Sequence, residues 1–244
     1  MMSFERGGLD QYPAPLIFDL DHTLWDFATN SRMSLIEGFD AFQLDTLGIE
    51  NVELWINSFE MANERCWALY RNGEIDKATL RTERFRRTLE SLGFNDTELA
   101  ASLGAHYVDV SPLQTRLIEG SEELLSELSE RGHRMWILTN GFEEVQRIKL
   151  ERCGLSHFFE AMYTSEQLGT KKPHANAFLE TARLAGLDPG ENIVMIGDSF
   201  GSDIIGAQNV GWRGVHYNPE GEIQDDAWRT VRCLRDILNL KLDS

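Results

Sequence analysis

The chain has 244 residues, which is enough for one larger domain or for a core domain with a smaller one attached. Its 40 acidic and 23 basic residues give a formal net charge of -17 and leave little to build the basic face that binding of a nucleic-acid polymer requires. Because no apolar stretch is long enough to cross a bilayer and no run is typical of a signal peptide, we expect a cytoplasmic protein that works away from membranes.

The first predicted element is a buried strand. Residues 15–18 form an apolar run without polar alternation, which is typical of a strand covered on both faces. From about residue 27 to residue 110 the sequence is rich in Glu, Arg and Leu at helical spacing and contains no proline. This pattern predicts a bundle of about four helices, one of which is expected to start at Asn95-Asp96-Thr97.

The second half of the chain alternates between helices and short apolar strands. The expected elements are a helix at 121–130, a strand at 135–138, helices at 143–152 and 175–185, a strand at 193–196, a further helix and a strand at 214–217. This alternation predicts a parallel sheet, to which the first strand must also belong because one strand cannot stand alone. We therefore predict a Rossmann-like α/β core, residues 1–26 and 112–244, with an inserted all-α cap domain, residues 27–111.

Two acids follow the first predicted strand directly. Ligands of open α/β sheets bind beyond the carboxyl ends of the strands, so Asp19 and Asp21 lie where a ligand is expected. One carboxylate can act as a nucleophile and metal ligand while the other serves as general acid and base. The alternative is a pair of solvated acids at a strand end.

Three further polar groups follow along the chain. Thr139-Asn140-Gly141 offers a hydroxyl and backbone N–H groups for phosphate oxygens, or a plain helix N-cap. The loop with Asp198 and Asp203 provides two acids and glycines that suit Mg²⁺, or solvated acids. In Lys171-Lys172-Pro173 a lysine could neutralise a phosphoryl oxygen, although such a pair is usually exposed.

In this order the four groups resemble the motifs of the haloacid dehalogenase superfamily of phosphohydrolases. The resemblance covers essentially the whole chain, because the helical insertion lies where the family's cap domain lies. The stretch from Leu138 to Pro173, with LTNGF, LERCGL and SEQLGTKKP, resembles the pyrimidine 5'-nucleotidase branch in particular. Sugar-phosphate and phosphoglycolate phosphatases share much of that stretch.

The resemblance implies a role for each catalytic residue. Asp19 would attack phosphorus, and Asp21 would protonate the leaving alcohol and then activate the hydrolytic water. Thr139 and the Asn140 backbone would hold phosphoryl oxygens, and Lys172 would balance charge, with Lys171 as the alternative lysine.

The resemblance also implies a metal cofactor. Mg²⁺ would be bound by Asp19, the Asp21 carbonyl group and Asp198, with Asp203 as a supporting acid. His22 stands where many relatives have a glycine or a small or acidic residue, and either a catalytic role or packing at the turn would account for it.

The expected activity is hydrolysis of a phosphomonoester through an aspartyl phosphate. Asp21 argues against a dehalogenase, which has no leaving alcohol to protonate. A phosphonate-cleaving relative would need a cap lysine for a Schiff base, and Lys77, the only lysine of the insertion, looks instead like part of an exposed helix start. A phosphomutase uses the same residues and stays an alternative. A binding module without activity is a remote alternative.

The substrate is expected to be a nucleoside 5'-monophosphate, with pyrimidines preferred. The alternatives are a sugar phosphate or phosphoglycolate. Trp67 of the insertion is a candidate for stacking on a base, although aromatic residues at helical spacing are typical of a core, and Trp25 and Phe27 are better placed to contact the substrate. Arg84 could meet a second anionic group of the substrate, but it is expected to be solvated. The partner would be a small phosphorylated metabolite, and the protein a monomer or a weak homodimer.

Overall fold

The structure, a computed structural model, describes residues 13–188, 191–221 and 226–242. The chain forms two compact units. The α/β unit comprises the described part of residues 1–23, 119–140 and 157–244, and the helical unit comprises residues 24–118 and 141–156. The N-terminal tail, residues 1–12, lies outside the described residues.

The α/β unit is built on a parallel sheet of six described strands in the order β3-β2-β1-β4-β5-β6. The strands are β1 (Leu16–Phe18), β2 (Met135–Thr139), β3 (Ala161–Thr164), β4 (Val194–Gly197), β5 (Arg213–Tyr217) and β6 (Arg229–Val231). The first strand lies in the middle of the sheet, between β2 and β4. The predicted parallel-sheet core is confirmed.

The strands β3 and β6 were not predicted from the sequence. They form the two edges of the sheet, and most of their residues are partly or fully exposed. An edge strand needs no continuous apolar run, because one side meets solvent, and polar residues there prevent pairing with other chains. The sequences AMYT and RTV therefore carry little of the pattern that identified the central strands.

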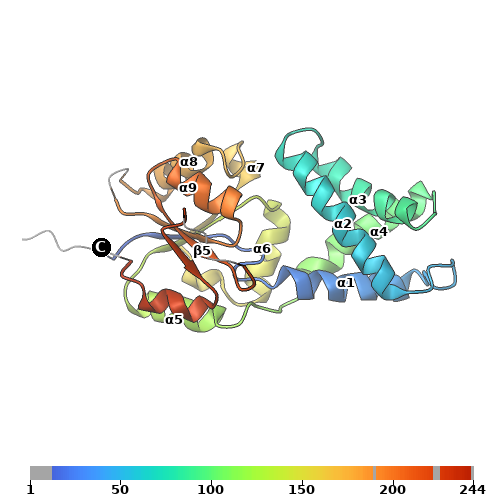
Figure 1. Cartoon of the computed structure of the whole chain (residues 1–244), viewed down its shortest axis with the longest axis horizontal. Coiled ribbons are helices and arrows are strands. Elements are labelled where there is room, and N and C mark those ends of the chain that lie inside the picture. The colour runs from blue at the N-terminus through green and yellow to red at the C-terminus, as the bar shows by residue number, and fades with distance from the viewer. Residues whose placement is uncertain (1–12, 189–190, 222–225, 243–244) are drawn as a thin grey trace, which may run out of the picture. The chain divides into compact units, whose positions relative to one another are not determined.

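Helices cover both faces of the sheet. Figure 1 shows α8 and α9 on one face and α5 on the other. The helical elements of this unit are α5 (Ser121–Glu130), α7 (Ser165–Leu168), α8 (Ala175–Ala185), the π-turn η3 (Phe200–Ile204), α9 (Ile205–Gln208) and η4 (Leu234–Asn239). The short η2 (Ser156–Phe158) spans the point in the chain where the helical unit ends and this unit resumes. Trp136, Phe178 and Met195 are among the residues that fill one buried core. This packing explains why the central strands lack polar alternation.

The helical unit contains the predicted bundle. Its elements are α1 (Phe27–Ala41), α2 (Val52–Arg71), α3 (Lys77–Ser91), α4 (Thr97–Val110), η1 (Ser111–Leu113) and α6 (Glu143–Arg152) (Figure 1). Each of the helices α1 to α4 begins after a side chain that accepts hydrogen bonds from the first turn, namely Asp26, Asn51, Asp76 and Asp96. The expected helix start at Asp96 is confirmed. No described helix has both the length and the apolar character that a membrane crossing requires.

The helix α6 groups with the helical unit, whereas the predicted boundaries place it in the core. Glu144 accepts a hydrogen bond from Lys77 Nζ at 2.8 Å and another from Arg81. The Phe142 ring stacks on Trp67 with centroids 5.5 Å apart. These partners come from distant parts of the chain, so the local pattern of residues 141–156 could not reveal the grouping.

The aromatic residues of the bundle form its core, and Trp55 and Phe59 are fully buried there. Arg84 is also buried, with 5% of its surface exposed, so the expectation of a solvated side chain is wrong. Its guanidinium lies over the rings of Phe59, Phe85 and Tyr107. The faces of these rings attract the cation and make burial possible.

Candidate active site

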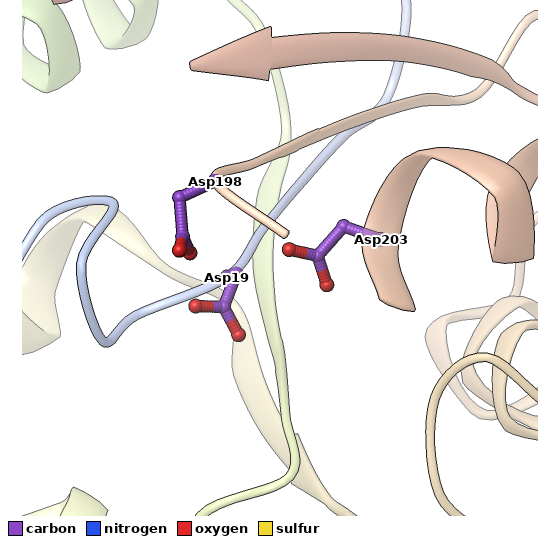
Figure 2. Close-up of side chains that lie close together, drawn as sticks. All are labelled: Asp19, Asp198 and Asp203. Atoms are coloured by element: carbon purple, nitrogen blue, oxygen red, sulfur yellow. The ribbon is translucent and has the colours of Figure 1, made fainter. Parts of the chain in front are cut away.

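Three carboxylates converge at the carboxyl edge of the sheet. Asp19 follows β1, Asp198 follows β4, and Asp203 lies in η3. Figure 2 shows their side chains directed toward one another from these segments. One oxygen atom from each residue lies within 4.8 Å of the others. The parallel order of β1 and β4 brings the first two acids together, as expected from strands that end at the same edge.

One buried lysine lies among these acids. Lys172 Nζ is 2.5 Å from Asp19 Oδ1 and 2.7 Å from Asp203 Oδ1, and it also donates to the Leu138 carbonyl group at 2.7 Å. Only 2% of the lysine's surface is exposed. Of the two lysine candidates in the sequence, Lys172 is the one whose ammonium group the fold places beside Asp19.

The cluster carries more negative charge than its lysine cancels. Burial raises the pKa of Asp19 well above its ordinary value; Lys172 lowers it in part, and repulsion from Asp203 and Asp198 raises it again. Burial and repulsion from Asp203 raise the pKa of Asp198 to about 7. Burial would lower the pKa of Lys172, but attraction to Asp19 and Asp203 raises it above its ordinary value. A further cation would relieve this repulsion.

The donor set fits a hard divalent cation such as Mg²⁺, which prefers carboxylate and carbonyl oxygens. Asp198 is held by Thr23, whose hydroxyl donates to Asp198 Oδ1 at 3.2 Å and accepts from the Asp198 N–H at 3.0 Å. His216 Nε2 lies 2.9 Å from the Asp198 carbonyl oxygen. The backbone and the side chain of Asp198 are therefore both fixed.

The position of Asp203 depends on a glycine. A Cβ atom at Gly197 would lie 2.3 Å from Asp203 Oδ2, so a larger residue would displace the acid. The same Oδ2 accepts a hydrogen bond from the Ser199 N–H at 3.1 Å. Gly197, which has no Cβ atom, thus makes room for a carboxylate.

The remaining predicted residues lie at the same edge. Thr139 ends β2 and is buried; because Phe18 pairs with Ile137 across the sheet, this threonine is beside the segment that follows β1. Asp21 is half-buried. His22 is exposed and has a φ of 62°, in the left-handed region that non-glycine residues rarely adopt.

The three candidate substrate contacts pack within the helical unit. Trp25 is fully buried, and its Nε1 donates to the Gln114 carbonyl group at 3.1 Å. Phe27 meets the Trp25 ring edge-on at 6.0 Å between centroids, and Trp67 is the residue that stacks on Phe142. Contact between these rings and a substrate stays a prediction.

Sequence reasoning missed two side-chain roles at this edge. It gave no role to Thr23, although this threonine follows Asp19 and Asp21 at the same two-residue spacing, and it assigned only the backbone of Asn140. In the structure the Asn140 side chain bonds to the backbone of Lys172. The spacing in the motif was a signal for Thr23, whereas the partner of Asn140 lies 32 residues away and left no local signal.

Comparisons with known proteins show what the chain is similar to. Pyrimidine 5'-nucleotidase PynA of Streptococcus pneumoniae is 30% identical over 92% of this chain and 93% of its own length. Pyrimidine 5'-nucleotidase YjjG of Escherichia coli is 30% identical over 92% and 96%. A ribulose-1,5-bisphosphate 5-phosphatase of Halopiger xanaduensis is 32% identical over 85% of each chain.

Among solved structures, a crystal structure of the HAD-hydrolase YfnB from Bacillus subtilis, bound to magnesium, has a TM-score of 0.82 to this chain. It is 26% identical, and the match covers 94% of this chain and 100% of that one. The family model for haloacid dehalogenase-like hydrolases matches residues 16–211, which include β1, β2 and β4 and every residue of the cluster described above. The chain therefore belongs to the haloacid dehalogenase-like hydrolase family.

Proposed function

We propose that the protein is a Mg²⁺-dependent phosphatase that hydrolyses nucleoside 5'-monophosphates, with pyrimidine nucleotides preferred. The observation that carries the chemistry is the convergence of Asp19, Lys172 and the acids Asp198 and Asp203 at one sheet edge. The substrate class rests on the similarity to PynA and YjjG over nearly the whole chain.

In this proposal Asp19 is the nucleophile. Its carboxylate attacks phosphorus, the bond to the ester oxygen breaks, and Asp21 gives its proton to the leaving alcohol. Asp21 then takes a proton from water, which attacks the aspartyl phosphate, releases inorganic phosphate and restores the Asp19 carboxylate. Lys172, at 2.5 Å from Asp19 Oδ1, holds the attacking group and balances its charge.

The phosphoryl group would be bound by polar groups of neighbouring strand ends. The Thr139 hydroxyl and the Asn140 backbone N–H would donate to phosphoryl oxygens. Asp19, the Asp21 carbonyl group and Asp198 would hold Mg²⁺, with Asp203 in support. A bound Mg²⁺ would neutralise oxygen charge, which is where most of the catalysis of phosphoryl transfer arises.

The proposal also covers the partner, the location and the oligomeric state of the enzyme. We infer a small phosphorylated metabolite as its partner, because the net charge of -17 disfavours a nucleic-acid polymer. We also infer a cytoplasmic location and a monomer or weak homodimer. Size-exclusion chromatography with light scattering over a range of concentrations tests the oligomeric state, and a stable higher oligomer would contradict it.

The test is a substrate panel with the purified protein and Mg²⁺. UMP, dUMP and dTMP are compared with phosphoglycolate and hexose phosphates by kcat/KM, and an Asp19→Asn preparation purified in parallel measures contaminating phosphatase. We expect the pyrimidine nucleotides to be the best substrates. A wide advantage for phosphoglycolate or a sugar phosphate would overturn the substrate class, and interconversion of phosphate esters without release of phosphate would point to a mutase.

A further inference from the structure

The side chain of Asn140 forms hydrogen bonds with both backbone polar groups of Lys172. Its Nδ2 donates to the Lys172 carbonyl oxygen at 2.9 Å, and its Oδ1 accepts from the Lys172 N–H at 2.9 Å. The Ser202 hydroxyl adds a longer bond to the same carbonyl oxygen at 3.4 Å. The asparagine thus contacts both polar groups of the residue whose ammonium lies beside Asp19.

This anchoring matters because lysine is flexible. A lysine side chain loses up to about 2 kcal/mol of rotamer entropy when it is fixed in one conformation. Its ammonium meets Asp19, Asp203 and the Leu138 carbonyl group only if the Cα atom starts from the correct position. The adjacent Lys171 carries the same functional group, so the position of the backbone decides which lysine enters the site.

We infer that Asn140 is a positioning residue whose side chain selects Lys172 as the lysine that pairs with Asp19. This inference rests on the proposed function and deepens it. The family resemblance implies only a phosphate contact for the Asn140 backbone. The side chain acts through Lys172, and its loss removes both of its bonds to the Lys172 backbone.

A double-mutant cycle tests this coupling. We expect Asn140→Ala to lower kcat by about 10- to 100-fold, as for other residues that orient a functional group, with little change in KM. Lys172→Ala should cost more, and the double variant should be no worse than Lys172→Ala alone. Asn218→Ala is the matched control, since it removes an asparagine bond of 2.9 Å to the Gly221 N–H in the same unit. Additive losses in the cycle would overturn the inference.

A second readout does not depend on activity. Reductive methylation of the metal-free protein, followed by peptide mapping, reports the accessibility of each lysine. We expect Lys172 to react slowly in the wild type and at least about tenfold faster in Asn140→Ala, because the local structure that buries it opens. The Asn218→Ala control should keep the slow rate, and unchanged protection of Lys172 in Asn140→Ala would contradict the inference.

A failure of the proposed function can be distinguished from a failure of the positioning role of Asn140. A wild type that hydrolyses no phosphate ester disproves the proposed function, whereas the methylation experiment still reports the positioning. Circular dichroism establishes that each variant is folded. If Asn140→Ala does not fold, Asn140→Ser, which keeps one hydrogen-bonding group, is compared in its place under the same two criteria.

Discussion

Each of the two units buries a positively charged side chain, and the groups that surround the charge differ between the units. Lys172 of the α/β unit pairs with Asp19 and Asp203. Arg84 of the helical unit donates to Asn63 Oδ1 at 3.2 Å and lies over aromatic rings, and none of the described carboxylates pairs with it. Burial lowers the pKa of Arg84, while the acids around Lys172 raise its pKa despite burial.

The difference shows which feature marks a functional site. A buried charge alone does not mark one, because the rings around Arg84 make it part of a packed core. Around Lys172, in contrast, the carboxylates outnumber the ammonium group, and repulsion from Asp203 helps to raise the pKa values of Asp19 and Asp198. Such excess charge is expected where a protein binds a cation or performs chemistry rather than where it only packs.

The strongest test of the α/β cluster is Asp19→Asn. We expect kcat to fall by at least about 10⁴-fold, because the amide cannot act as the nucleophile. The far-ultraviolet circular dichroism should not change, since asparagine has nearly the same size. Asp76→Asn, at the N-cap of α3, is the matched control and should keep its rate. Near-normal turnover by Asp19→Asn would remove the nucleophile from the proposal.

Replacing Lys172 or Arg84 by methionine compares the two units directly. In chelator, Lys172→Met leaves the carboxylates without a counter-charge and should lower the free energy of unfolding by about 3 kcal/mol. Arg84→Met leaves no carboxylate unpaired and removes one hydrogen bond, to Asn63 Oδ1, so it should change this free energy by no more than about 1.5 kcal/mol. Urea titrations followed by tryptophan fluorescence measure both. Equal losses would mean that the two cations are stabilised in the same way.

Metal addition should reveal a further difference between the two units. If the carboxylate cluster binds Mg²⁺, a concentration of 100 times Kd stabilises the native protein by about 2.7 kcal/mol, which thermal unfolding detects as a higher Tm. Asp198→Asn should lose most of this shift, whereas Arg84→Met should keep it. A full shift in Asp198→Asn would place the cation elsewhere. Removal of Mg²⁺ by a chelator should abolish turnover, and its return should restore it.

Much of the sheet edge that carries Asp19 and Asp198 could be predicted from the sequence because of one topological rule. Apolar runs identified β1, β2 and β4, and the carboxyl ends of neighbouring parallel strands must meet. The acids Asp19 and Asp198 therefore had to be close, although they are far apart in the chain. The helices α5 and α8 could be predicted because their periodic apolar residues form a local pattern.

What could not be predicted depends on partners that no local pattern names. Arg84 looks like a solvated arginine in the sequence, and its burial follows from aromatic residues on α2 and α4. The role of the Asn140 side chain depends on a backbone 32 residues away. The grouping of α6 with the helical unit arises in the same way from Lys77 and Arg81.

The smallest expected effect concerns an ion pair at the surface of the helical unit. Hydrogen bonds from Arg86 lower the pKa of Glu83 from its ordinary value of 4.5 to about 2. Burial opposes this shift, and hydrogen bonding from Arg87 adds to it. Between these values the unfolded chain binds a proton that the folded protein does not. The stabilisation is therefore complete above pH 4.5 and is lost as the pH falls toward 2.

Because the pair is partly solvated, we expect its contribution to be below about 1 kcal/mol and to shrink in high salt. Acid titrations of the free energy of unfolding should have a shallower slope in Glu83→Gln than in the wild type, while the exposed control Glu64→Gln should match the wild type. An unchanged slope in Glu83→Gln would show that solvent screening cancels the pair. The contrast with Lys172, whose buried carboxylate partners raise its pKa, would then become sharper.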